Sequence, residues 1–202
     1  MTKKRRILIS VTDKTGIGKF KTLTDTGEWE IISTGGTLVR LEKLGVPCVS
    51  IESVTGFPEM MGGRLKTLHP NIFGGILADR SNESHMKDLE IHGIHPIDIV
   101  VVNLYDFDGN PDIEQIDIGG PSLLRAAAKN GLHSIPIIDP ENYDLVIDQV
   151  KNTGDVSMET RQMLAMNVFD HISTYDQVIF DWMFDHATGQ QSFLVPQVKS
   201  GH

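Results

Sequence analysis

The sequence predicts an α/β fold, a three-layer sandwich around a central, mostly parallel sheet, with helices added at the C-terminal end. Two observations predict it. Short apolar or β-branched runs alternate with segments of helical spacing as far as about residue 150. Strands that alternate with helices at this interval pair in parallel through right-handed crossovers. In addition, IDIVVVNL at 97–104 is an unbroken apolar run, which suits a central strand covered on both faces.

The first quarter of the chain contains the clearest alternation. Its expected elements, in order, are a strand at 7–11, a helix from the polar TDKTG turn to about residue 24, a strand at 29–33, a helix over the leucines at 38–44 and a strand at 46–51. Gly45 marks the end of the second helix, because glycine readily adopts the left-handed conformation that terminates helices. These elements make two strand–helix–strand units.

The loop that follows, TGFPEMMGGRLKTLHP at 55–70, has no clean helical or strand period. Irregular backbone of this length normally lies on a surface or lines a site. Arg64, Lys66 and His69 recur every two or three residues after the flexible pair Gly62-Gly63. We interpret this segment as an anion-binding loop.

The rest of the chain continues the alternation and then changes character. Residues 72–77 fit either a short strand or the closing segment of the loop. The later expected elements are a helix at 81–93, the strand at 97–104, a helix starting at Pro121, a strand at 134–138, a helix at 142–150 and one or two amphipathic helices over 157–186. We therefore expect a core at 1–154 and a C-terminal helical extension at 155–202 packed on it.

Composition narrows the class of protein. The 202 residues carry a net charge of −9 with a pI near 5.3, so a nucleic-acid partner is not expected. No stretch approaches a membrane span, and the apolar run after the basic residues at 3–6 is too short for a secretory signal. The single cysteine, Cys48, permits no internal disulfide. These features predict a cytoplasmic protein.

Four polar turns follow apolar strand-like runs, and in a parallel sheet they meet at one edge. They are Thr12-Asp13-Lys14, Thr34-Gly35-Gly36-Thr37, the segment from Arg64 to Thr67, and Asn103-Leu104-Tyr105. Hydroxyls, glycine N–H groups and cations suit a phosphate monoester. The chain has neither a P-loop nor the GxGxxG fingerprint, no GxSxG elbow and no histidine spacing typical of a metal site. We therefore expect no metal and no cofactor, and acid–base chemistry by Asp117, Lys129, Lys66, His69 or Tyr105.

Five motifs carry a resemblance. VTDKTGI, STGGT, TGFPEMMGGRLKTLHP, NLYDF and IDIGGPSLLRAAAKN resemble, in this order, those of the IMP cyclohydrolase domain of the bifunctional purine-biosynthesis enzyme, AICAR transformylase/IMP cyclohydrolase. The resemblance covers about residues 7–182 and implies a methylglyoxal-synthase-like fold. It also implies a hydrolase-class enzyme that closes 5-formamidoimidazole-4-carboxamide ribonucleotide (FAICAR) to inosine monophosphate (IMP) and water, the last step of de novo purine biosynthesis, without a cofactor.

The resemblance also implies site residues. Those expected to bind the phosphate and ribose are Thr12, Asp13, Lys14, Thr34, Gly35, Gly36, Thr37, Arg64, Lys66 and Thr67, and those on the base side are Val102, Asn103, Asp117, Ile118 and Gly119. Lys129 matches the proton donor/acceptor lysine, and Lys66, Tyr105 and Asp117 match the other proposed catalytic groups. In chemical terms, Asp117 oriented by Lys129 would take a proton from the amide, while Lys66 and the N–H of Tyr105 would stabilise the oxyanion.

The chain also departs from the family pattern. Asp106 replaces the usual proline of NLYPF, and the segment before IEQIDIGG is short. The 202 residues do not include the large transformylase domain, so the chain is either a stand-alone cyclohydrolase or a fragment of the bifunctional enzyme. The expected partners are a nucleotide substrate, a separate AICAR transformylase and a second copy in a homodimer. Two alternative functions share the fold: methylglyoxal synthase, and a non-catalytic nucleotide-binding regulatory domain.

Overall fold

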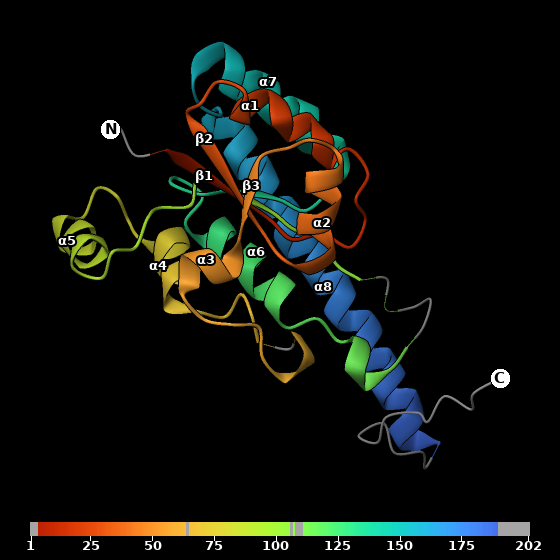
Figure 1. Cartoon of the computed structure of the whole chain (residues 1–202). Coiled ribbons are helices and arrows are strands. Elements are labelled where there is room, and N and C mark those ends of the chain that lie inside the picture. Colours follow the sequence, from red (N-terminus) through yellow and green to blue (C-terminus); the bar gives the residue numbers. More distant parts are fainter. Residues whose placement is uncertain (1–3, 64, 106, 108–110, 190–202) are drawn as a thin grey trace.

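A computed structural model describes residues 4–63, 65–105, 107 and 111–189. Its centre is a five-stranded sheet in which every neighbouring pair is parallel. The strands are β1 (Arg5–Ile9), β2 (Trp29–Ser33), β3 (Cys48–Ser50), β4 (Ile99–Val101) and β5 (Ile135–Ile137), in the order β3-β2-β1-β4-β5 (Figure 1). This arrangement confirms the predicted α/β class.

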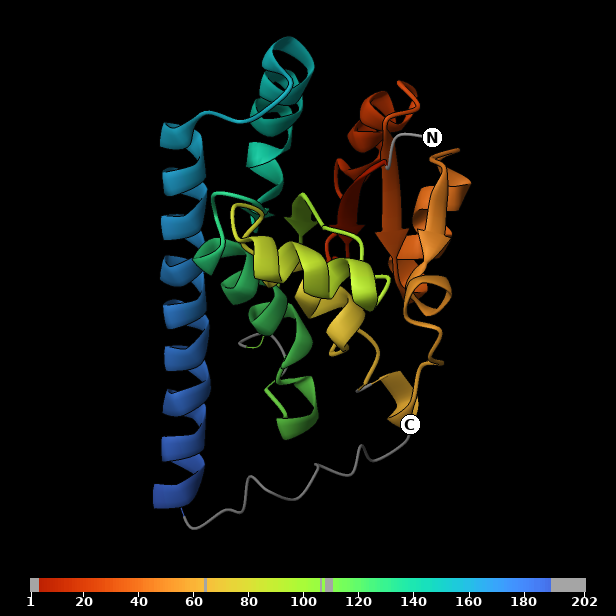
Figure 2. The ribbon, with the colours of Figure 1, turned by 90° about the vertical axis from the view of Figure 1, so that its left-hand side faces the viewer.

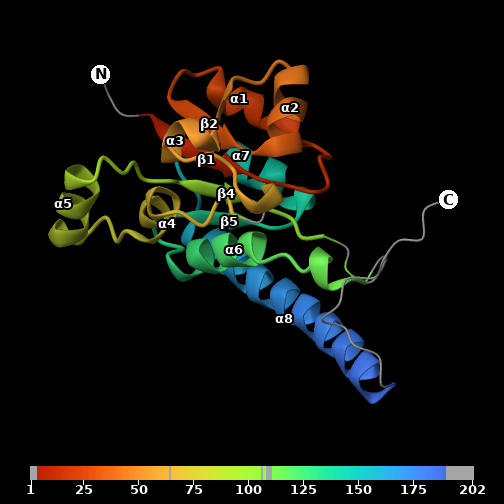
Figure 3. The same cartoon turned by 60° about the horizontal axis from the view of Figure 1, so that its bottom comes forward.

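Helices cover both faces of the sheet and complete the three layers (Figures 1 and 3). One face carries η1 (Ile17–Phe20), α1 (Lys21–Thr24), α2 (Gly35–Lys43), η4 (Pro140–Asn142) and α7 (Tyr143–Thr153). The other carries α3 (Ile51–Thr55), α4 (Pro70–Leu77) and α6 (Gly119–Lys129). The short helices η2 (Met61–Gly63) and η3 (Ile113–Gln115) lie in connecting loops, and α5 (Glu83–Ile91) projects to the side.

Alternation along the strands explains the two layers of core. Ile7 and Ile9 of β1 are fully buried in one hydrophobic cluster, whereas Leu8 between them is fully buried in the other. Successive side chains of a strand point to opposite faces, so β1 needs apolar residues throughout. Each such burial stabilises the fold by about 1.5–3 kcal/mol.

A single long helix, α8 (Met158–Thr188), forms where one or two were expected. Ser157 caps it, because its hydroxyl oxygen accepts the N–H of Thr160 at 3.2 Å. Leu164 belongs to the first hydrophobic cluster, and Val168 and Ile172 belong to the second. The first half of α8 therefore packs along the β5 side of the sheet, and its second half extends past the sheet (Figures 2 and 3). The division at residue 154 stays a prediction.

Several expected elements have other bounds in the structure: the strand expected at 7–11 is β1, and the strand expected at 46–51 is β3, after which Ile51 begins α3. Three further differences lie closer to the candidate site. Residues 72–77 belong to α4, because Pro70 occupies the first helical position and the His69 ring caps it by accepting the N–H of Asn71 at 3.1 Å. The strand expected at 97–104 is shorter, since the N–H of Ile97 donates to Gly75 rather than to a strand. Helix α6 begins at Gly119, two residues before Pro121.

No helix in the described ranges combines the length and apolar character that crossing a bilayer requires.

Candidate active site

The carboxyl ends of β1 and β4 define the candidate site. The chain moves from β1 outward to β2 and β3, then returns to place β4 on the other side of β1. In open parallel sheets, ligands bind in the crevice at such a reversal, outside the carboxyl ends of the strands. The predicted polar turns after β1, β2 and β4 all begin at this edge.

Hydroxyl groups join the turn after β1 to the turn after β2. The hydroxyl of Thr37, in the first turn of α2, accepts the N–H of Val11 at 3.2 Å and donates to its carbonyl at 2.9 Å. The hydroxyls of Ser10 and Thr34 lie 3.1 Å apart. Gly35 opens α2 with φ of 44°, a left-handed conformation that favours glycine. Two of the predicted phosphate-binding turns therefore form one connected surface.

Asn103 joins the turn after β4 to the same surface. Its amide oxygen accepts the N–H groups of Thr12 at 2.6 Å and Asp13 at 3.0 Å, and its amide nitrogen donates to the Asp13 carbonyl at 2.8 Å. Both N–H groups are thus already used by Asn103 rather than directed at a ligand. The cation of Lys14 donates to the carbonyls of Val11 and Thr12 and lies over the start of α2, near Gly36.

A second group of predicted residues gathers at the start of α6. Asp117 accepts the N–H of Gly120 through Oδ1 at 2.9 Å. A Cβ added at Gly119 would lie 3.0 Å from the Thr67 hydroxyl, and one added at Gly120 would overlap with the Asp117 carboxyl and lie 3.2 Å from the Val102 side chain. The loop residue Thr67, the strand-end residue Val102 and the helix start therefore meet around one carboxyl group.

Burial and nearby positive charge shift the pKa of that carboxyl group in opposite directions. Burial raises the pKa of Asp117 above its ordinary value, while the N–H groups of Gly120 and Gly119 and the charge of Lys66 lower it. A carboxylate that is both partly desolvated and near a cation is suited to taking a proton. Among the predicted cations that the structure describes, Lys66 is the one that contributes to the Asp117 environment.

The remaining predicted residues occupy the rim or lie apart. Tyr105 and Ile118 are on the surface, 49% and 62% exposed. Lys129 is exposed in the last turn of α6, ten residues after Gly119, which is about 15 Å along a helix. The structure therefore does not bring Lys129 beside Asp117, contrary to the expected pairing. Arg64 lies outside the described residues, as does Asp106.

Sequence analysis missed Tyr175 of α8. Its hydroxyl oxygen accepts the N–H of Asp117 at 2.8 Å, although the two residues are 58 positions apart. The helical spacing of Tyr175 assigned it to the core, and it is indeed 8% exposed. The available signal was its hydroxyl, since a buried tyrosine usually has a hydrogen-bond partner.

A cavity of about 350 Å³ adjoins the rim on the β5 side. Its walls come from residues 103–105 and 107, from 138–140 and from α8, and include Asn103, Tyr105 and Tyr175. Within the described ranges, no three His, Cys, Asp or Glu side chains are grouped as metal ligands.

Comparisons with known proteins agree with the motifs. The family model of the MGS-like domain matches residues 17–135, and that of the AICARFT/IMPCHase bienzyme matches 127–200. The chain is 52% identical over 190 residues to the bifunctional purine biosynthesis protein PurH of Anoxybacillus flavithermus, with 89% of this chain and 37% of that protein covered. For PurH of Bacillus subtilis the identity is 51% over 189 residues, with the same coverage.

A solved structure, described as the crystal structure of ForH, aligns with a TM-score of 0.78 at 34% identity and covers 86% of this chain and 96% of that one. The chain spans less than two-fifths of the length of the two PurH relatives. These matches confirm the resemblance to the bifunctional purine-biosynthesis enzyme, and the chain belongs to the MGS-like domain family.

Proposed function

We propose that the chain is an IMP cyclohydrolase, which closes FAICAR to IMP and water. The observation that carries the proposal is the half-buried Asp117 carboxyl, influenced by the Lys66 charge and held at the start of α6. The similarity to PurH, a bifunctional purine biosynthesis protein, supports the same reaction class.

In this proposal the connected turns hold the nucleotide by its phosphate and ribose. Hydroxyls and cations surround the phosphate oxygens, and arginine can donate to two oxygens at once. The proposed phosphate and ribose ligands are Thr12, Asp13, Lys14, Thr34, Gly35, Gly36, Thr37, Arg64 and Thr67. The proposed base-side contacts are Val102, Asn103, Asp117, Ile118 and Gly119. The base would thus lie beside the carboxyl group that performs the chemistry.

Ring closure forms a carbon–nitrogen bond and releases water. The carboxamide nitrogen attacks the formyl carbon, and the formyl oxygen takes the negative charge. Asp117 accepts the proton that the amide loses, and Lys66 stabilises the oxyanion and supplies a proton to it. In the second step, the carbon–oxygen bond breaks as the hydroxyl takes the proton held by Asp117 and leaves as water, and the former formamide nitrogen gives its proton to Lys66. Both side chains regain their starting protonation states, and no oxidant or reductant is required. Holding the two groups together supplies much of the rate.

Two further residues complete the proposed catalytic set with weaker geometric support. The N–H of Tyr105 is the second proposed oxyanion donor, since it follows Asn103 at the rim of the crevice. Lys129 is included on the resemblance alone, because it lies at the far end of α6 from Asp117.

The proposal extends to the setting in which the chain acts. Its partners are the nucleotide, a separate AICAR transformylase that supplies FAICAR, and a second copy in a homodimer. Its location is the cytoplasm. The relatives named PurH are bifunctional proteins, which supports a functional link to a transformylase.

A substrate panel tests the function. Purified protein is incubated with FAICAR or with dihydroxyacetone phosphate, and products are identified by mass spectrometry, while IMP binding is measured by calorimetry. IMP formation supports the proposal. Methylglyoxal formation would assign the synthase activity instead, and IMP binding without turnover of either substrate would assign a regulatory module.

A further inference from the structure

Tyr175, near the middle of α8, directs its hydroxyl toward the candidate active site. The hydroxyl oxygen accepts the N–H of Asp117 at 2.8 Å, and the tyrosine is 8% exposed. Asp117 lies between η3 and α6, outside any helix or strand. Buried backbone N–H groups in such positions need a partner from elsewhere. The hydroxyl of Tyr175 is therefore the group that satisfies the backbone of Asp117.

The carboxyl group of Asp117 is held from another direction. Its Oδ1 accepts the N–H of Gly120 at 2.9 Å, and the carboxyl lies so close to Gly120 that a Cβ there would overlap with it. Tyr175 thus fixes the backbone of Asp117 while the start of α6 fixes its side chain. Two fixed points determine the direction in which the carboxyl group faces.

The same stretch of α8 also holds the segment that leads from Tyr105. Phe107 is 2% exposed and packs edge-on against Tyr175, with ring centroids 6.4 Å apart, and against Trp182, at 5.4 Å. Leu104 and Ile116 pack against the same cluster. Residues 175–183 of α8 therefore support both segments that carry proposed catalytic groups.

Tyr143 shows that a tyrosine can be buried in the described part of this core although its hydroxyl forms no hydrogen bond there. It is 1% exposed, and its buried hydroxyl has no hydrogen-bond partner among the residues that the structure describes. Its ring packs edge-on against Phe20 at 5.1 Å. A buried tyrosine in this core therefore does not need a hydrogen bond to its hydroxyl. The hydrogen bond between Tyr175 and Asp117 is an additional interaction that packing does not explain.

We propose that Tyr175 is a positioning residue for ring closure, which holds the Asp117 backbone so that the carboxyl group faces the substrate. The inference rests on the proposed function, because it gives α8 a part in the reaction at Asp117. It predicts an effect on turnover rather than on nucleotide affinity, since the hydroxyl of Tyr175 bonds to Asp117 and, in the described part of the chain, to no proposed phosphate ligand.

The variant Tyr175→Phe tests this role, because it removes the hydroxyl and keeps the ring against Phe107. We expect kcat for FAICAR to fall at least tenfold, about 1.4 kcal/mol, with KM within twofold of wild type. The thermal midpoint should shift by only a few degrees. Hydrogen exchange at the Asp117 amide, followed by NMR, should accelerate. Phe107→Leu, which keeps the hydroxyl and loosens the ring contact, should cause a smaller loss of kcat.

Tyr143→Phe is the matched control, since it also deletes one buried hydroxyl, and it should leave kcat and KM unchanged. An unaltered kcat in folded Tyr175→Phe, or an equal loss in Tyr143→Phe, would overturn the inference. Failure of wild-type protein to convert FAICAR would reject the proposed function. In that case the hydrogen-exchange rate of the Asp117 amide still decides whether Tyr175 anchors Asp117. Equal rates in wild type and Tyr175→Phe would overturn the anchoring, and a faster rate in the variant would uphold it.

Discussion

At the scale of single residues, the candidate site depends on the surroundings of the Asp117 carboxyl group. Desolvation raises the pKa of Asp117, and the two glycine N–H groups and Lys66 partly offset that rise. The carboxyl group therefore combines a raised proton affinity with a neighbouring positive charge. Those are the properties that a base next to a developing oxyanion requires.

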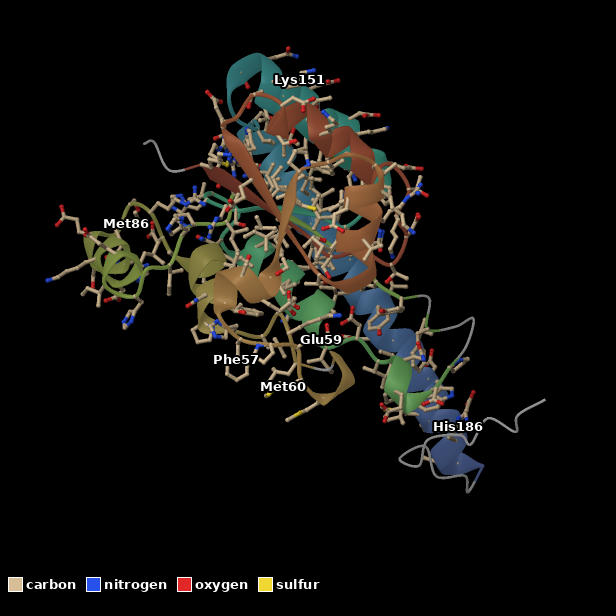
Figure 4. The ribbon with its side chains drawn as sticks, viewed as in Figure 1. Phe57, Glu59, Met60, Met86, Lys151 and His186 are labelled. Atoms are coloured by element: carbon tan, nitrogen blue, oxygen red, sulfur yellow. The ribbon has the colours of Figure 1, made fainter. Side chains whose placement is uncertain are left out.

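The variant Lys66→Ala should lose turnover without unfolding. Lys66 is half-buried in a loop, outside both hydrophobic clusters. Removing one group that stabilises an oxyanion typically lowers kcat by about 100- to 1,000-fold. Steady-state kinetics and thermal melts check this expectation. Lys151→Ala, on the exposed side of α7 far from the site (Figure 4), is the control and should be neutral. Near-normal kcat in Lys66→Ala would remove Lys66 from the mechanism.

The variant Asp117→Asn should bind IMP and close the ring about 100-fold or more slowly, because the amide cannot accept the proton. The pH dependence has a definite sign. Turnover needs the deprotonated carboxyl, so wild-type kcat should fall as pH drops through the raised pKa of Asp117, above the ordinary value of 3.8. That acid limb should be absent from Asp117→Asn. Asp148→Asn, at an exposed position of α7, should keep both the wild-type kcat and the acid limb of the pH profile. An identical limb in both variants would assign the titration to another group.

At the scale of elements, the connections between turns matter more than the turns themselves. Thr37 joins α2 to the turn after β1, and Asn103 joins that turn to the end of β4. A change in any one element is therefore transmitted to the other two, and the proposed phosphate site depends on all three.

The variant Thr37→Val should lower the free energy of unfolding by about 1–3 kcal/mol, because it leaves the buried N–H of Val11 without a partner. It should also raise KM for FAICAR, since the turn at 12–14 would be less fixed. Urea denaturation and kinetics measure the two effects. Thr37→Ser keeps the hydroxyl and should retain most of the stability. A larger loss in Thr37→Ser than in Thr37→Val would show that the methyl group, not the hydroxyl, is responsible.

The sequence predicted the strands and most helices well because their signals are local. Apolar runs located all five strands, and the helix expected at 81–93 corresponds to α5 (Glu83–Ile91). The side chain of Asn82 caps α5 by accepting the N–H groups of Ser84 and His85. The helix at 70–77 was missed although Pro70 is a start signal, because its cap is a histidine side chain and the pair Gly74-Gly75 lowers the helical propensity of the segment. The pairing of Asp117 with Lys66 and Tyr175 joins segments about 50 residues apart, and no local pattern reports it.

At the scale of the whole molecule, α8 contributes to both faces of the core. Leu164 lies in one hydrophobic cluster, and Val168 and Ile172 lie in the other. The buried guanidinium of Arg161 adds bonds to the Asp155 carboxylate at 2.6 Å and the Gly131 carbonyl at 2.8 Å. These contacts favour folding of the sheet and α8 as one cooperative unit, and bring Tyr175 to the site.

The variant Leu164→Ala should therefore destabilise the whole molecule, by about 2–5 kcal/mol. Leu164 is 1% exposed, and its loss leaves a cavity against the sheet. Circular dichroism and the fluorescence of Trp29 in β2 should report one shared transition at a lower urea midpoint, both measured in a Trp182→Phe background because Trp182 lies in α8. Met166→Ala, 66% exposed on the same helix, should change little. If helix signal were lost well before the fluorescence change, α8 would be an independent unit, as a division at residue 154 implies.

The most direct test of the central claim is the rate of IMP formation from FAICAR by this chain alone, followed by absorbance and confirmed by mass spectrometry. We expect a rate far above the rate in buffer, which rises in proportion to protein concentration. The substitution Asp117→Asn should largely abolish it. A rate equal to that in buffer, from folded protein that still binds IMP, would contradict this expectation.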